Sequence, residues 1–215
     1  MNYVQFQQWL PSLLEGLKIT LLASAISIFT SIVWGSIVSI LSSLGSRILS
    51  GVMRVYTSIF RNTPLLVIMF FCFYGLPLMG VSMPALVCGI LAITLNEGAF
   101  VAEILRGAVK NLPAGEIEAA YSLGLSRFSV VTRIVFPLAI RNSVPMLTGQ
   151  ASIMVKDTSL FSLIMIVDIT RAGSMFYDKY LSSVSIWIVA AIYVAIFLLI
   201  TQLGKFVEKK SLVAR

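Results

Sequence analysis

Two charged residues, Lys156 and Asp157, lie inside a stretch that is otherwise largely apolar, from about Pro145 to Val167. A charge near the middle of a membrane costs about 2.5–3.5 kcal/mol to insert, so both side chains should face a partner group or a water-filled cavity. Neighbours in a helix point about 100° apart, so the two charges do not simply pair with each other. Together they could line a polar path and bind a substrate that carries both an anionic and a cationic group. The alternative is structural, with each charge capping or tying a neighbouring helix.

The composition of the chain indicates an integral membrane protein. Hydrophobic residues make up 58% of the 215 positions and charged residues only 12%, far from the balance of a soluble domain of this length. The net charge of +7 could suggest nucleic acid, but the basic residues cluster between apolar stretches, where they are better interpreted as topology signals. We therefore predict membrane lipid around the chain and no nucleic-acid partner.

Catalytic and metal-binding side chains are scarce in this sequence. Histidine is absent, and Cys72 and Cys88 lie within apolar stretches without ligand spacing around them. A His-based catalytic site is excluded, and both thiols are most simply small packing residues. We predict no catalytic residue, no metal site and no cofactor bound by this chain.

The apolar stretches predict the architecture when they are compared with the roughly 20 residues that cross a bilayer as a helix. The prediction is an all-α membrane protein with a single domain over residues 1–215. Met1–Lys18 lacks the positive region of a cleaved signal, so the first span should be retained. The five predicted spans cover about 19–44, 63–79, 84–105, 145–167 and 180–203, and a polar loop covers about 106–141.

The distribution of Lys and Arg predicts the orientation. Twelve of the sixteen lie in 45–61, 106–141 and 204–215, segments that share one side of the membrane if there are five spans. By the positive-inside rule that side is cytoplasmic, so the N-terminus is predicted outside and the C-terminus inside.

The polar segment Glu116–Pro137 separates the third and fourth predicted spans. It begins after Pro113 with helix-forming residues, is interrupted at Gly124 and resumes toward Pro137. We predict a short helix, a turn and a second helix. Such a surface element could dock a soluble partner, and the alternative is an ordinary amphipathic linker.

This segment resembles the EAA loop of ABC-transporter permeases. The family pattern is Glu-Ala-Ala, three residues, Gly, nine residues, Ile, one residue and Leu-Pro, and here it reads Glu118-Ala119-Ala120, Gly124, Ile134 and Phe136-Pro137. Phe136 in place of Leu is the one departure. The resemblance implies a cytoplasmic coupling helix that sits in a cleft of a separate ATPase subunit. The coupling residues it implies are Glu118, Ala119, Ala120, Tyr121 and Gly124.

A wider resemblance covers about Arg61 to Leu160. The matching pieces are Arg61-Asn62-Thr63-Pro64-Leu65-Leu66, Tyr74-Gly75-Leu76-Pro77, Ala102-Glu103-Ile104, Arg106-Gly107-Ala108 and Lys156-Asp157-Thr158-Ser159-Leu160. They are similar to the ABC permeases that import histidine, arginine, glutamine or glutamate, with Glu116 and Leu138 each standing where Gln is common.

This resemblance implies a subunit of an amino-acid importer in a bacterial inner membrane, with a substrate pathway that includes Thr63, Lys156, Asp157 and Thr158. The implied partners are ABC ATPase subunits, a second permease copy or paralogue, and a soluble substrate-binding protein.

The energy source leaves alternatives open. Gly204-Lys205 lacks the upstream glycine and the following Ser or Thr of a phosphate-binding loop, so ATP must be bound by a partner subunit. An ion-coupled secondary amino-acid transporter or channel could instead use Lys156 and Asp157 as its ion site. An intramembrane enzyme would need a nucleophile–base pair that the sequence does not offer.

Other polar residues near the spans could face the pathway or a partner, or could form contacts within the protein. Asn96 and Glu97 could face the pathway, although a helix–helix hydrogen bond is the better interpretation. Glu103 and Arg106 are spaced for an ion pair on one helix face. Asp168 and Arg171 are spaced for a local ion pair with a mainly structural role, and the alternative is contact with a binding protein.

Overall fold

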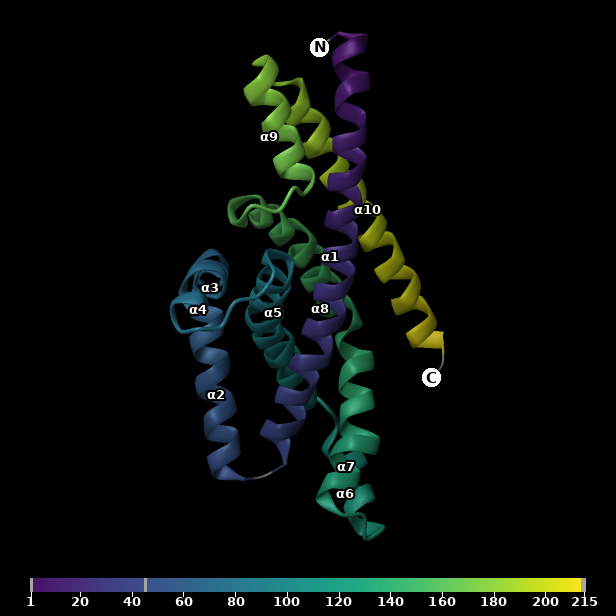
Figure 1. Ribbon diagram of the computed structural model, residues 1–215. Coiled ribbons are helices and arrows are strands. Elements are labelled where there is room, and N and C mark those ends of the chain that lie inside the picture. Colours follow the sequence, from purple (N-terminus) through teal and green to yellow (C-terminus); the bar gives the residue numbers. More distant parts are fainter. Residues whose placement is uncertain (1, 45, 214–215) are drawn as a thin grey trace. The chain divides into compact units, whose positions relative to one another are not determined.

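The computed structural model describes residues 2–44 and 46–213, and within this part of the chain every regular element is a helix (Figure 1). Two basic residues that support the predicted orientation, Arg215 and the side chain of Lys210, lie outside what is described. The elements are α1 (Tyr3–Ser43), α2 (Arg47–Asn62), α3 (Leu65–Phe70), η1 (Phe71–Gly75), α4 (Leu76–Leu78), α5 (Ala85–Lys110), α6 (Ala114–Ser122), α7 (Arg127–Val130), η2 (Val131–Val135), α8 (Phe136–Asp157), η3 (Thr158–Ile164), α9 (Ile169–Tyr180) and α10 (Val184–Val213).

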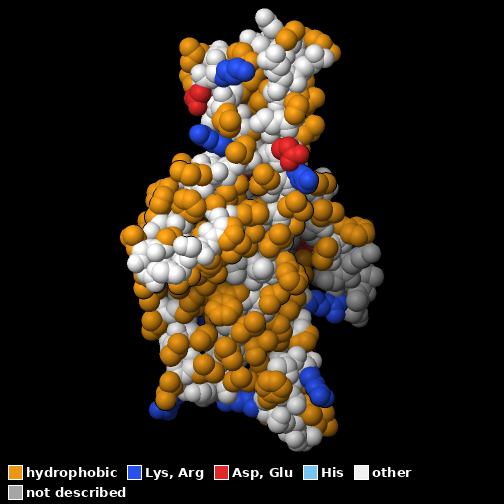
Figure 2. Space-filling model, viewed as in Figure 1, with side chains coloured by type: hydrophobic (Ala, Val, Ile, Leu, Met, Phe, Trp, Pro, Cys, Tyr) orange, Lys and Arg blue, Asp and Glu red, His pale blue; other side chains and the backbone are white. Residues whose placement is uncertain are grey.

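Four helical stretches in the described residues are long and apolar enough to cross a membrane: Tyr3–Ser43, Ala85–Lys110, Arg127–Ile164 and Val184–Lys209. The pair formed by α2 and Leu65–Leu78 passes the same test as one broken span and makes a fifth. Hydrophobic side chains far outnumber charged ones on the visible face, as expected for a chain surrounded by lipid (Figure 2). The predicted all-α membrane fold with about five spans is confirmed.

The first helix differs from its predicted boundaries. It begins at Tyr3 rather than near residue 19 and continues past Pro11, Glu15 and Lys18 without a break. Charged residues mark where a helix leaves the hydrocarbon, but they do not end its hydrogen bonding. The sequence pattern therefore located the apolar part of α1 and missed its polar extension.

The second span also differs from the prediction, because a helix precedes it. Thr63 does not open a helix but is the C-cap of α2, and α3 begins at Leu65 after an axis change of 101°. Pro64 explains the break, since proline lacks an N–H and disfavours the helical conformation of the residue before it.

The chain divides into two compact units. One contains residues 2–28, 65–93 and 151–202. Its packed cluster joins α1 to α9 and α10 through Trp9, Leu13, Ile169, Phe176 and Val189. The Trp9 Nε1–H donates to the Ala172 carbonyl at 2.9 Å, and the Thr20 hydroxyl accepts from the Ile169 N–H at 3.2 Å.

The other unit contains residues 29–64, 94–150 and 203–213 of the described chain. In it α1 and α5 approach so closely that a Cβ on Gly35 would lie 2.6 Å from the Gly98 carbonyl oxygen. The Thr30 and Thr94 hydroxyls lie 2.6 Å apart across the same pair of helices. Small residues that let helix backbones meet are the usual means of packing in lipid.

Candidate functional site

The segment between the third and fourth spans forms a helix, a turn and a second helix, as predicted (Figure 1). Helix α6 ends at Ser122, and Gly124 adopts φ +75°, a left-handed conformation that glycine accepts without a Cβ penalty. Ser126 then caps α7 by accepting from the Ser129 N–H. The second helix is not short, because α7 continues through the π turn η2 into α8.

An apolar cluster holds α6 in place from one side. Ala120, Val130 and Val135 are buried in it, and partly buried residues pack around them. These residues are Val109, Leu112, Ile117, Leu125 and Ile134. In addition, the Arg127 guanidinium donates to the Ser43 carbonyl at the end of α1 at 3.3 and 3.4 Å. One side of α6 is therefore packed against the protein, and the opposite side is exposed.

The open side of α6 exposes Glu118, Ala119 and Tyr121, which belong to the predicted coupling set. Gly124 is also exposed, whereas Ala120 is buried in the apolar cluster on the other side of the helix. Two residues that the sequence interpretation did not single out, Leu123 and Phe128, are 80% and 61% exposed. Their signal in the sequence was large apolar side chains within a polar segment. Exposed apolar side chains beside a carboxylate are typical of a protein-docking surface.

Three of the predicted pathway residues are consecutive at the end of α8, in the first unit. Lys156 is exposed, and its Nζ lies 5.7 Å from the centre of the Phe197 ring on α10. Asp157 is half-buried at the junction of α8 and η3. Thr158 is fully buried, and its hydroxyl donates to the Val155 carbonyl at 2.7 Å. Lys156 is thus the most accessible of the three, while the Thr158 hydroxyl at the start of η3 already donates to the end of α8.

The fourth predicted pathway residue, Thr63, belongs to the second unit. Its hydroxyl donates to the Ile59 carbonyl at 2.8 Å, and its own carbonyl accepts from the Asn96 side chain at 3.2 Å. The interpretation of Asn96 and Glu97 as helix–helix contacts is confirmed. Glu97 is buried and accepts a hydrogen bond from the Gln150 side chain on α8.

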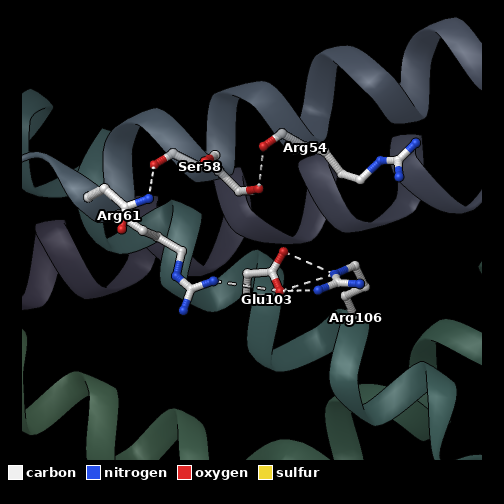
Figure 3. Close-up of polar contacts among 7 residues, drawn as sticks. Arg54, Ser58, Arg61, Glu103 and Arg106 are labelled. Atoms are coloured by element: carbon white, nitrogen blue, oxygen red, sulfur yellow. Dashed lines mark hydrogen bonds and ion pairs between the residues drawn. The ribbon is translucent and has the colours of Figure 1, made fainter.

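The Glu103 carboxylate lies between two arginines (Figure 3). It accepts from Arg106 Nε at 3.0 and 3.1 Å, which confirms the predicted pair, and Arg61 of α2 approaches it to 3.7 Å. The Arg61 guanidinium also lies 5.1 Å from the centre of the Phe100 ring. These contacts tie α2 to α5, with a modest energy because the arginines are partly exposed.

Asp168 is a helix cap, and its contact with Arg171 is to the backbone rather than an ion pair. Its carboxylate accepts from the backbone N–H groups of Thr170 and Arg171, at 3.1 and 2.9 Å. Burial raises the pKa of this carboxyl above its ordinary value, and the two backbone hydrogen bonds partly oppose the shift. This arrangement is consistent with the structural role predicted for Asp168.

Side chains that could hold a metal ion are not grouped in the part of the chain that the structure describes. Across residues 2–44 and 46–213, no group of three His, Cys, Asp or Glu side chains is placed to hold an ion.

Solved structures share this architecture. An amino-acid ABC transporter crystallised with histidines superposes with a TM-score of 0.87 at 26% identity, covering 98% of this chain and 99% of that one. An inward-facing MetNI methionine ABC transporter gives a TM-score of 0.80 at 22% identity, with the same coverage, and so supports the fold alone.

Sequence relatives cover nearly the whole chain. The glutamine transport system permease protein of Escherichia coli K12 is 32% identical over 94% of this chain and 91% of its own length. The nopaline transport system permease protein of Agrobacterium fabrum is 35% identical over 92% of this chain and 87% of its own. The family model for binding-protein-dependent transport system inner membrane components matches residues 31–212. This chain therefore belongs to the family of inner membrane components of binding-protein-dependent transport systems.

Proposed function

We propose that this chain is the membrane-spanning subunit of an ATP-driven ABC importer that carries a polar amino acid across a bacterial inner membrane. The observation that carries the proposal is the similarity, over more than nine tenths of the chain, to permeases of glutamine and nopaline transport systems. The solved amino-acid ABC transporter with histidines supports the same substrate class.

The ATPase subunit docks on α6 in this proposal. Glu118 and Tyr121 form the exposed contact, Leu123 and Phe128 extend it, and Ala120 and Gly124 fix the shape of the loop. ATP is bound and hydrolysed by that partner and not by this chain. ATP-driven closure of the ATPase pair would move α6 and switch the pathway between outward-open and inward-open states.

The remaining partners and the orientation follow from the same proposal. A second permease copy or a paralogue completes the pathway, and a soluble substrate-binding protein delivers the amino acid. The positive-inside rule supports a cytoplasmic position for α6 and the C-terminus and an external position for the N-terminus.

Lys156 bears on the substrate class. An exposed ammonium group in an apolar setting attracts a carboxylate and repels a guanidinium, which favours acidic or amide amino acids over arginine. Asp157, Thr158 and Thr63 complete the proposed pathway set.

The test is uptake of labelled glutamate and arginine by the complete transporter reconstituted in vesicles loaded with ATP. We expect uptake to require internal ATP, and Lys156→Glu to reduce glutamate uptake by roughly tenfold while reducing arginine uptake less. Lys179→Glu is the matched control, because Lys179 has the same charge and also lies over an aromatic ring, Tyr180, at 5.0 Å.

Two results would count against the proposal. An equal loss of glutamate and arginine uptake in Lys156→Glu would show that Lys156 does not select between these substrates. Uptake that persists without ATP and stops with an uncoupler would favour the ion-coupled transporter instead.

A further inference from the structure

The Phe60 carbonyl near the end of α2 needs a donor that the backbone of α2 does not supply. In an α-helix the Phe60 carbonyl would accept from the N–H of residue 64, which is Pro64 and has none. An unsatisfied carbonyl is destabilising where water is excluded. The break between α2 and α3 therefore creates a specific requirement at Phe60.

Asn96 of α5 meets this requirement. Its Nδ2 donates to the Phe60 carbonyl at 2.6 Å and to the Thr63 carbonyl at 3.2 Å, so both hydrogens of one amide are used. The side chain is 96% buried, since Asn96 is only 4% exposed. Neighbouring carbonyls of α2 accept hydrogen bonds from residues at the end of the same helix. The Asn62 side-chain amide donates to the Ser58 carbonyl, and the Thr63 hydroxyl donates to the Ile59 carbonyl.

A second contact joins the same helices one residue away. The Tyr56 hydroxyl of α2 donates to the Leu95 carbonyl of α5 at 2.6 Å, and it accepts from Trp34 Nε1 of α1 at 2.7 Å. Asn96 is therefore part of a connection between α5 and the end of α2, in which its amide holds the Thr63 carbonyl.

Helix α5 lies between the docking helix α6 and the end of α2, so it can transmit movement from one to the other. Helix α5 ends at Lys110, and α6 begins at Ala114 after a link of three residues. Val109 of α5 also packs against the apolar cluster that contains Ala120 of α6, so a displacement of α6 would act on α5 as well. The hydrogen bonds of Asn96 join α5 in turn to the end of α2.

We propose that Asn96 is a positioning residue for transport, whose amide couples the movement of α5 to Thr63 and the break that follows it. The proposal rests on the proposed function, in which α6 docks the ATPase and Thr63 lies on the substrate pathway. Asn96 acts through the backbone of α2 and does not itself need to touch the amino acid.

The test compares Asn96→Ala with Asn62→Ala in the complete transporter, with an equal mixture of histidine, arginine, glutamine and glutamate as substrate. Both changes remove one amide, but the Asn62 amide is bonded only within α2. We expect Asn96→Ala to lower the number of amino acids imported per ATP hydrolysed by about tenfold and Asn62→Ala to leave it unchanged.

The double variant Pro64→Ala/Asn96→Ala separates positioning from mere stability. Alanine at position 64 carries an N–H and lets α2 continue through Thr63, which is extended in the wild type, so that this N–H can reach the Phe60 carbonyl. The unfolding temperature should then recover while import per ATP stays low, and Pro64→Ala alone is the control for the extension of α2. If Asn96→Ala alone does not accumulate in the membrane, the double variant is compared with Asn62→Ala in its place.

Recovery of import in the double variant would overturn the proposal, as would normal import by Asn96→Ala. A wild-type complex without amino-acid-stimulated ATP hydrolysis would instead refute the proposed function. The two failures are therefore distinguishable.

Discussion

Glu118→Lys is expected to leave the protein in the membrane and to reduce ATP-driven uptake by roughly tenfold or more. The carboxylate is exposed on α6, so its replacement removes no packing within this chain. At a docked interface, however, reversal of one charge of a close pair costs several kcal/mol. Uptake and ATP hydrolysis should be measured together in vesicles, with hydrolysis no longer dependent on the amino acid.

Glu116→Lys is the matched control for this experiment. Glu116 is exposed on the same helix, but two residues along a helix correspond to a rotation of about 200°, which places it on another side. We expect uptake close to wild type in this variant. Equal losses in both variants, or normal uptake in Glu118→Lys, would contradict a specific docking role for Glu118.

Gly35→Val is expected to have the largest effect on stability. A Cβ at this position would lie 2.6 Å from the Gly98 carbonyl oxygen and 2.7 Å from the Val101 Cβ, atoms that cannot move aside independently of α5. Overpacking of this kind costs about 1–3 kcal/mol or more. The measurement is the unfolding temperature of the purified protein in detergent, together with its yield in the membrane.

Gly51→Ala serves as the control for the glycine change. Nothing lies within 4 Å of a Cβ on Gly51, and the residue is inside α2. Alanine is favoured over glycine in a helix by about 1 kcal/mol, so the unfolding temperature should stay the same or rise slightly. An unchanged unfolding temperature in Gly35→Val would show that α1 and α5 do not depend on close contact at this glycine.

The spans and the EAA segment could be predicted because their signals are local. A bilayer fixes the length of an apolar helix, and Gly124 interrupts a run of helix-forming residues at the point where the structure turns. The polar extension of α1 and the helix at Arg47–Asn62 were not predicted as helices. Both contain charges, and hydropathy does not distinguish a polar helix from a loop.

The polar contacts between helices could not be derived from spacing. The sequence left Asn96 and Glu97 open between pathway and packing, because their partners, Phe60, Thr63 and Gln150, are more than 30 residues away along the chain. The burial of Thr158 was equally hidden, since a hydroxyl within a family motif can either face a cavity or bond its own helix. Such choices depend on tertiary packing.

The most direct test of the central claim is ATP hydrolysis by this chain co-purified with its ATPase subunit in lipid. The assay uses the matching binding protein and a panel of single amino acids. We predict that one polar amino acid stimulates hydrolysis and that Glu118→Lys abolishes the stimulation. If no ATPase subunit co-purifies while the protein remains folded, the docking role of α6 is wrong and an ion-coupled transporter becomes the better explanation.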